Sequence, residues 1–157
     1  MINKPSLCDG FFCSKKGRLM KAKHIIIIAA LFAFCAVAIG ALGAHGLKNH
    51  LSTTALAWVT TAATYQMYHA LALLAVAALL LKFGKQKSLL FVSYSFCVGI
   101  ILFSGSLYLL AFSEVSGFTH LKSYLVYLTP LGGFALLLGW IGLIFAAVSL
   151  PVNSATE

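Results

Sequence analysis

Residues 89–112 read LLFVSYSFCVGIILFSGSLYLLAF and contain no Asp, Glu, Lys or Arg. A helix of about 20 apolar residues crosses the roughly 30 Å of hydrocarbon in a bilayer, so this stretch is long enough to span a membrane. Three more stretches without these charged residues occupy 25–47, 55–81 and 124–150. The pattern predicts an all-α membrane protein with four transmembrane helices in an antiparallel bundle.

The composition excludes an ordinary soluble domain. Of the 157 residues, 61% are hydrophobic and 9% are charged, whereas soluble domains carry about 25% charged residues. The four stretches use most of the chain, so we expect one transmembrane domain over residues 23–150, followed by a short tail at 151–157. The expected helices lie at about 25–44, 60–81, 88–111 and 124–148.

The N-terminal segment differs from the rest of the chain. Residues 1–22 are polar and basic and lack helical periodicity, so we predict a disordered extension there. Met20 is followed by Lys21 and Lys23 just before an isoleucine run, and it would itself serve as a translation start. We therefore expect residues 1–19 to be either an extension or a misassigned start.

The net charge of +8 is concentrated beside alternate loops. Six Lys and Arg residues precede the first span and three lie at 82–87, whereas Lys48 and Lys122 stand alone in the other two connections. Basic residues gather on the cytoplasmic side of membrane proteins. The charge is therefore interpreted as an orientation signal, with both termini in the cytoplasm, and no nucleic-acid partner is predicted. The basic N-terminus could also contact anionic lipid head groups.

Polar side chains inside the spans are the candidate functional groups, because a polar group in hydrocarbon is costly. Tyr65, Gln66 and His69 lie in the second span, and Tyr65 and His69 share a helix face because they are four residues apart. His69 is placed close to the bilayer middle, and no Asp or Glu lies in any span. We expect a neutral imidazole bonded to a Ser, Thr or backbone carbonyl of another helix; the alternative is a ligand, proton or ion site.

Other polar groups extend this candidate site. The full set is His45, Tyr65, Gln66, His69, Ser104 and Tyr108. A metal site would need His45, His50 and His120 together, and two loop histidines are weak evidence for one. Ser104-Gly105-Ser106 could resemble a nucleophile turn, but no acidic residue accompanies it. We predict no enzymatic activity, metal or cofactor.

Small residues at helical spacing predict where helices approach closely in lipid. In the first span, Ala36, Gly40 and Ala44 are four residues apart. The glycines expected at close helix contacts are Gly40, Gly43, Gly105, Gly132 and Gly133.

The order of the polar patches resembles a known family. The patches are VAIGALGAHGL at 37–47, YQMYH at 65–69, LFSGSLY at 102–108 and TPLGG at 129–133, followed by Gly139-Trp140. Together they resemble the YgdD/YwdK-like family of small bacterial inner-membrane proteins, which contain a domain of unknown function. The resemblance covers about residues 23–148, and residues 1–22 depart from it. It implies four transmembrane helices in the plasma membrane and supplies no activity, substrate or catalytic residue.

The predicted function is a structural or accessory role in the inner membrane. The chain would act through helix packing with itself, as a homo-oligomer, or with a larger membrane partner, using the small-residue faces of the first and fourth spans. The alternative is a small oligomeric channel or transporter with a polar path near His69 and His45. The lipid bilayer is the expected surrounding partner in either case.

Overall fold

The computed structural model describes residues 8–84, 86–116 and 122–149, with the side chains of the first helix described from Leu19 onward. Its four helices are α1 (Cys8–His45), α2 (Thr53–Phe83), α3 (Lys87–Ser116) and α4 (Lys122–Val148). Each is long and apolar enough to cross a membrane, α1 over Leu19–His45. The predicted class, an all-α protein with four transmembrane helices, is confirmed.

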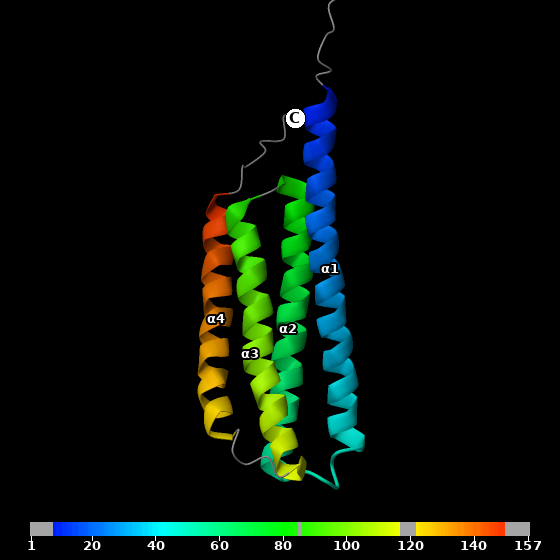
Figure 1. Ribbon diagram of the computed structural model, residues 1–157, viewed down its shortest axis with the longest axis vertical. Helices are drawn as coiled ribbons and strands as arrows, with labels where there is room; N and C mark the ends of the chain where they lie inside the picture. Colours follow the sequence, from blue (N-terminus) through cyan, green and yellow to red (C-terminus); the bar gives the residue numbers. More distant parts are fainter. Residues whose placement is uncertain (1–7, 85, 117–121, 150–157) are drawn as a thin grey trace, which may run out of the picture.

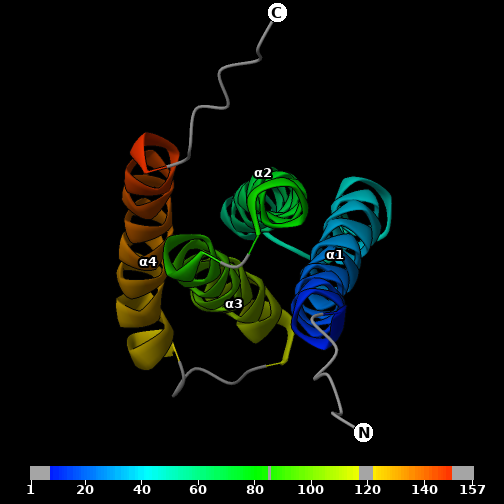
Figure 2. The same ribbon diagram turned by 90° about the horizontal axis from the view of Figure 1, so that it is seen from above.

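The helices form an antiparallel bundle in which extensive contacts join only neighbours in the chain, α1 with α2, α2 with α3, and α3 with α4 (Figure 1). Seen from above, α1 and α4 lie on opposite sides of the central α2 and α3 (Figure 2). The central helices bury 44% and 50% of the residues in their apolar stretches, against 11% in α1 and 22% in α4. The two outer helices therefore present most of their surface to lipid.

The first helix begins earlier than the sequence indicates. We predicted a disordered extension over residues 1–22, but residues 8–22 continue α1, and Ala22 is fully buried. No proline interrupts the chain between Cys8 and His45. Adding a residue to an existing helix gains a hydrogen bond without a new nucleation cost, so the apolar span can extend into the basic segment. Residues 1–7 and the predicted tail at 151–157 lie outside the described part of the chain.

The second helix also begins before its predicted start at residue 60. Ser52 caps it by accepting a hydrogen bond from the Ala55 N–H at 3.1 Å. A serine cap satisfies one of the backbone donors that a helix start leaves free. The helix ends at Gly84, whose φ of 89° is readily adopted only by glycine. The third helix continues to Ser116, five residues past its predicted end at 111.

A small residue recurs every seven positions along one face of α1 and along one face of α2. These residues are Ala22, Ala29, Ala36 and Gly43 on α1, and Ala63, Ala70 and Ala77 on α2. The alanines are at most 9% exposed. A Cβ added at Gly40 would lie 3.6 Å from the Ala63 Cβ, and one added at Gly43 would lie 2.8 Å from Val59 Cγ1. Seven-residue spacing is that of coiled-coil seams, so α1 and α2 pack along a small-residue seam.

The α3–α4 interface depends on a closer approach. A Cβ added at Gly132 would lie 2.3 Å from the Phe103 backbone nitrogen and 2.7 Å from its Cα. On the facing helix, a Cβ added at Gly99 would lie 2.3 Å from Leu136 Cδ2. Van der Waals packing holds helices together in lipid, because lipid tails are as apolar as the side chains. Glycine at these positions lets the two backbones come into direct contact.

We predict opposite effects for alanine at two adjacent glycines. Gly132→Ala should destabilise the fold by about 1–3 kcal/mol, because its Cβ would overlap backbone that cannot rotate away. Gly133→Ala is the matched control: its Cβ would lie 3.7 Å from the Phe103 ring, an ordinary contact, so stability should stay equal or rise. Thermal unfolding in detergent measures both. Equal effects of the two substitutions would contradict the close approach at Gly132.

Candidate functional site

The centre of the polar site is His69, which lies near the middle of α2 and is 5% exposed. Its Nδ1–H donates to the Tyr65 carbonyl at 2.7 Å, and its Nε2 accepts from Trp140 Nε1–H of α4 at 3.1 Å. An imidazole that donates at one nitrogen and accepts at the other is neutral. The neutral ring agrees with our expectation, but its partner on another helix is an indole rather than a Ser, Thr or carbonyl.

The two bonded rings pack with a third aromatic ring, so that three helices each contribute one ring. Phe96 of α3 lies with its ring centroid 5.4 Å from His69 and 5.3 Å from Trp140, in tilted and edge-to-face arrangements. Such geometries are favoured for aromatic rings. Gly139 makes room for them, since a Cβ there would lie 2.5 Å from the Phe96 ring. The His69–Phe96–Trp140 cluster thereby joins α2, α3 and α4 at one point.

Each pair of sequential helices is also joined by one polar bond within the span. These bonds run from Gln66 Nε2 to the Phe32 carbonyl (2.8 Å), from Ser104 Oγ to the Ala62 carbonyl (2.9 Å), and between the hydroxyls of Ser106 and Thr129 (2.7 Å). They connect α1 with α2, α2 with α3, and α3 with α4, respectively. Gln66 and Ser104, which we predicted as part of one site, therefore lie at different helix interfaces, where each makes a structural hydrogen bond.

Tyr108 lies apart from the His69 cluster. Its hydroxyl is buried and has no hydrogen-bond partner among the residues that the structure describes. It lines an apolar cavity of about 400 Å³ between the end of α1 and the second half of α3. Ser104, which shares its helix face by sequence, instead turns to the Ala62 carbonyl of α2. The structure thus does not unite Tyr108 and Ser104 in one bonded group.

His45 is also separate from His69. It is the last residue of α1 and is exposed, whereas His69 is buried within the span. His120, the third ligand that a metal site would need, lies outside the described residues. Within the described ranges, no three His, Cys, Asp or Glu side chains are grouped so that they could hold a metal ion.

The geometry does not favour the channel or transporter alternative. Both nitrogens of His69 are occupied by hydrogen bonds, and its ring is enclosed by aromatic side chains. Cavities of about 260, 330 and 400 Å³ lie along α1, and neither His69 nor His45 lines any of them. The predicted polar path between the two histidines is therefore not formed by these cavities.

Sequence reasoning missed Phe96 and Trp140 as members of the central cluster. Trp140 offered a usable signal: it lies eight residues before the end of α4, whereas tryptophan is usually found at the membrane interface. A tryptophan well inside a span needs an acceptor for its N–H. In the second span, His69 was the one side chain with a free ring nitrogen near that depth. Phe96 carried no such signal, because apolar residues surround it in sequence.

We predict that His69 and Trp140 are energetically coupled. Single replacements His69→Phe and Trp140→Phe should each lower the free energy of unfolding. The double variant should lose less stability than the two single losses added together. The coupling should be about 0.6 kcal/mol, and at most about 1.7 kcal/mol, as for other hydrogen bonds between membrane helices. Unfolding of all four proteins in detergent measures it. Trp58→Phe, combined with His69→Phe, is the control pair and should be additive.

Comparisons with known proteins agree with this architecture. A family model described as "Protein of unknown function (DUF423)" matches residues 39–133. A UPF0382 membrane protein of Haemophilus influenzae is 42% identical over 128 residues, covering 82% of this chain and 95% of the relative. The UPF0382 membrane protein YwdK of Bacillus subtilis is 40% identical over 126 residues, covering 80% and 97%.

The UPF0382 inner membrane protein YgdD of Escherichia coli K12 is 35% identical over 133 residues, covering 83% of this chain and 94% of the relative. No solved structure matches the chain. The resemblance seen in the order of the polar patches is thus confirmed over most of the chain. The chain belongs to the DUF423, or UPF0382, family of membrane proteins, for which no specific function is established.

Proposed function

We propose that the protein is a non-catalytic structural or accessory component of the bacterial inner membrane that acts through helix packing. One observation supports this most directly: the polar side chains inside the spans bond the four helices to one another. Gln66, Ser104 and Ser106 each join a sequential pair, and His69 joins α2 to α4. Groups engaged in this way stabilise a scaffold, and their atoms are not available to bind a transported species.

The surface for an external contact differs from the one the sequence suggested. The small-residue faces of α1 and α4 are occupied within the chain, by α2 and α3. Gly105 of α3 has open space instead, since no described atom of another helix lies within 4 Å of an added Cβ. Ile101 and Leu109, one turn to either side, are 60% and 52% exposed. A glycine between exposed large residues forms a notch that admits a helix of a second copy closely.

Self-association through this notch predicts a specific variant effect. Gly105→Leu should reduce the dimer fraction at least severalfold without lowering thermal stability, because a Cβ at this position lies in open space and meets no atom of another described helix. The matched control, Ala30→Leu, enlarges an exposed residue of α1 and should leave the dimer fraction unchanged. Single-molecule photobleaching in nanodiscs counts the subunits. A wild-type protein that is monomeric and captures no partner from native membranes would sink the accessory role.

A flux measurement separates this proposal from transport. Proteoliposomes with the wild-type chain should conduct no ions above empty vesicles, and His69→Ala should change nothing. Flux that appears with the wild type and is lost with His69→Ala would contradict the structural role.

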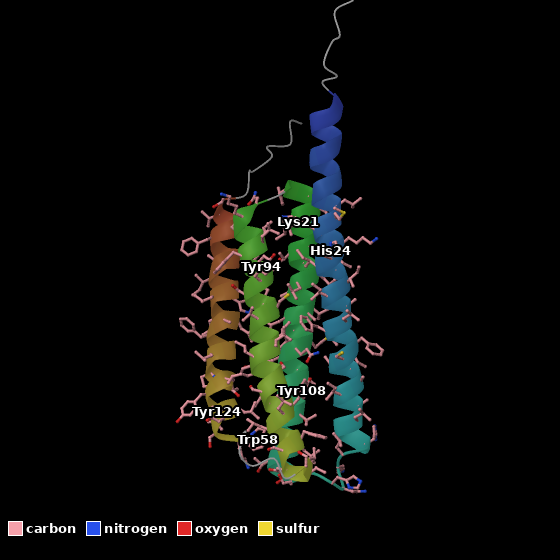
Figure 3. The ribbon with its side chains drawn as sticks, viewed as in Figure 1. Lys21, His24, Trp58, Tyr94, Tyr108 and Tyr124 are labelled. Carbon is pink, nitrogen blue, oxygen red and sulfur yellow. The ribbon has the colours of Figure 1, made fainter. Side chains whose placement is uncertain are left out.

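We also propose that both termini face the cytoplasm. The distribution of the described lysines supports this orientation. The end where α1 enters the span carries Lys21, Lys23, Lys82 and Lys87, and the other end carries Lys48 and Lys122. Figure 3 shows Lys21 and His24 near one end of the bundle and Trp58 and Tyr124 near the other. Lys122 Nζ lies 5.9 Å from the centre of the Trp58 ring, a cation–π contact suited to the interface.

The orientation is tested by reporter fusions. Alkaline phosphatase fused to the C-terminus should be inactive, and green fluorescent protein fused there should fluoresce, because the first requires the periplasm and the second the cytoplasm. Phosphatase inserted between His45 and Thr53 should be active. The reverse pattern would overturn the assignment.

A further inference from the structure

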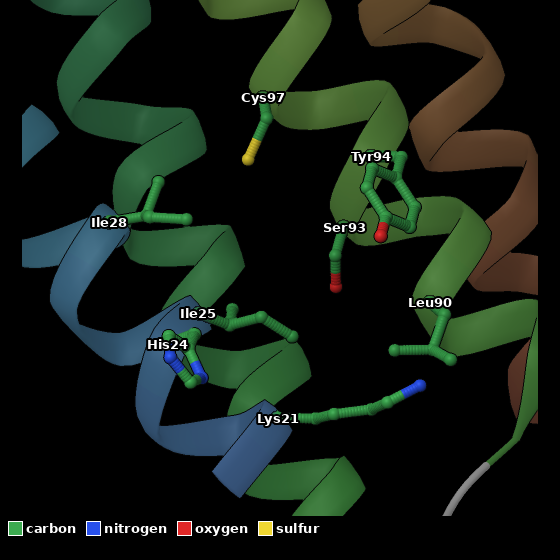
Figure 4. Close-up of a pocket in the computed structure, with 8 residues that line it drawn as sticks. All are labelled: Lys21, His24, Ile25, Ile28, Leu90, Ser93, Tyr94 and Cys97. Carbon is green, nitrogen blue, oxygen red and sulfur yellow. The ribbon is translucent and has the colours of Figure 1, made fainter.

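A crevice of about 260 Å³ opens between α1 and α3, near the end of the bundle that holds Lys21. In the described part of the chain α1 packs on α2, and α3 packs on α2 and α4, so α1 and α3 make few contacts with each other and leave the crevice open between them. Its lining includes Lys21, His24, Ile28, Ser93, Tyr94 and Cys97 (Figure 4).

The outer part of the crevice is basic. Figure 4 shows the Lys21 side chain extended across the opening toward Leu90 of α3. Among the described side chains the only carboxylate is Glu114, at the opposite end of the bundle, so Lys21 has no acidic partner within that part of the chain. His24 donates from Nδ1 to the Met20 carbonyl, so Nε2 of the neutral ring can only accept a hydrogen bond and the cationic group at the mouth is Lys21. Among the side chains that the structure describes, the site therefore offers positive charge without a counter-ion.

The inner part of the crevice is apolar. Ile28 lies two turns deeper than Lys21 along α1, and Cys97 lies about 15 Å from the start of α3 at 1.5 Å per residue. Ser93 adds little polarity, because its hydroxyl is used in a bond to the Leu89 carbonyl at 2.9 Å. The crevice thus runs from a cationic mouth at head-group depth to an apolar floor in the hydrocarbon.

We propose that this crevice binds one anionic phospholipid, with its phosphate on Lys21 and the first part of an acyl chain along Ile28 and Cys97. Basic pockets between membrane helices are suited to anionic head groups. A zwitterionic choline lipid would bring an ammonium group to a mouth with no described carboxylate. A free phosphate ion would leave the apolar floor without a contact. This inference is independent of the self-association proposed for Gly105.

Native mass spectrometry of the full chain in a neutral detergent tests the site. Phosphatidylglycerol and phosphatidylcholine with identical acyl chains are titrated separately, and inorganic phosphate is added as a competitor. Phosphatidylglycerol should bind the wild type at least severalfold more tightly than phosphatidylcholine. Lys21→Gln should weaken phosphatidylglycerol about fivefold, the contribution of one lysine at an anionic surface. Lys21→Arg should retain the binding.

Two controls separate a defined site from diffuse attraction. Lys23→Gln removes the same charge from an exposed residue that does not line the crevice, and it should change binding less than twofold. Cys97→Phe fills the apolar floor at unchanged charge and should weaken phosphatidylglycerol, with circular dichroism confirming the fold. Equal losses in Lys21→Gln and Lys23→Gln, no preference between the lipids, or full competition by inorganic phosphate would each overturn the proposal.

Discussion

Hydrocarbon provides no hydrogen-bond partner for a side chain, and this constraint accounts for where Gln66, His69 and Ser104 lie. Gln66 and Ser104 donate to backbone carbonyls of neighbouring helices, and Ser106 bonds Thr129. His69 has the most demanding requirement, because a neutral imidazole needs both a donor and an acceptor partner. It finds one in its own helix and the other in Trp140 of α4. The hydrogen bond from the Trp140 indole therefore helps to fix the position of α4 relative to α2.

The two outer helices are attached to the centre in different ways. The α1–α2 contact repeats a small residue every seven positions, so its closeness is spread over the whole length of the span. The closest α3–α4 approach is at Gly132, where the backbone of Phe103 occupies the space that a Cβ would fill. A change of one residue should matter little in the first interface and a great deal in the second. The exposed surfaces of both outer helices carry large apolar side chains, as lipid-facing surfaces do.

Much of this architecture could be predicted from the sequence, because length and hydropathy determine membrane spans directly. Four helices and the family followed from uncharged stretches and from the order of their polar patches. The faces that meet could be predicted only in part: small residues indicated the contacts at Gly40, Gly43 and Gly132, but spans that are apolar all round carry no amphipathic pattern to orient the rest. Gly105 and Gly132 look alike in sequence, yet one has open space and the other touches backbone. Two helix starts were predicted too late because local effects, not hydropathy, determine them. The first helix is elongated into the basic segment before Ile25, and the second begins where Ser52 caps it.

The sequential contacts of the bundle set an order of assembly during synthesis. Since extensive contacts join helices that follow one another in the chain, an interface can form as soon as its second helix enters the bilayer, and local contacts of this kind form fast. The bond between His69 and Trp140 is different, because it joins α2 and α4, which are not consecutive in the chain. It can form only after the last helix has been inserted. A chain that ends before Trp140 therefore inserts with the Nε2 of His69 lacking this partner.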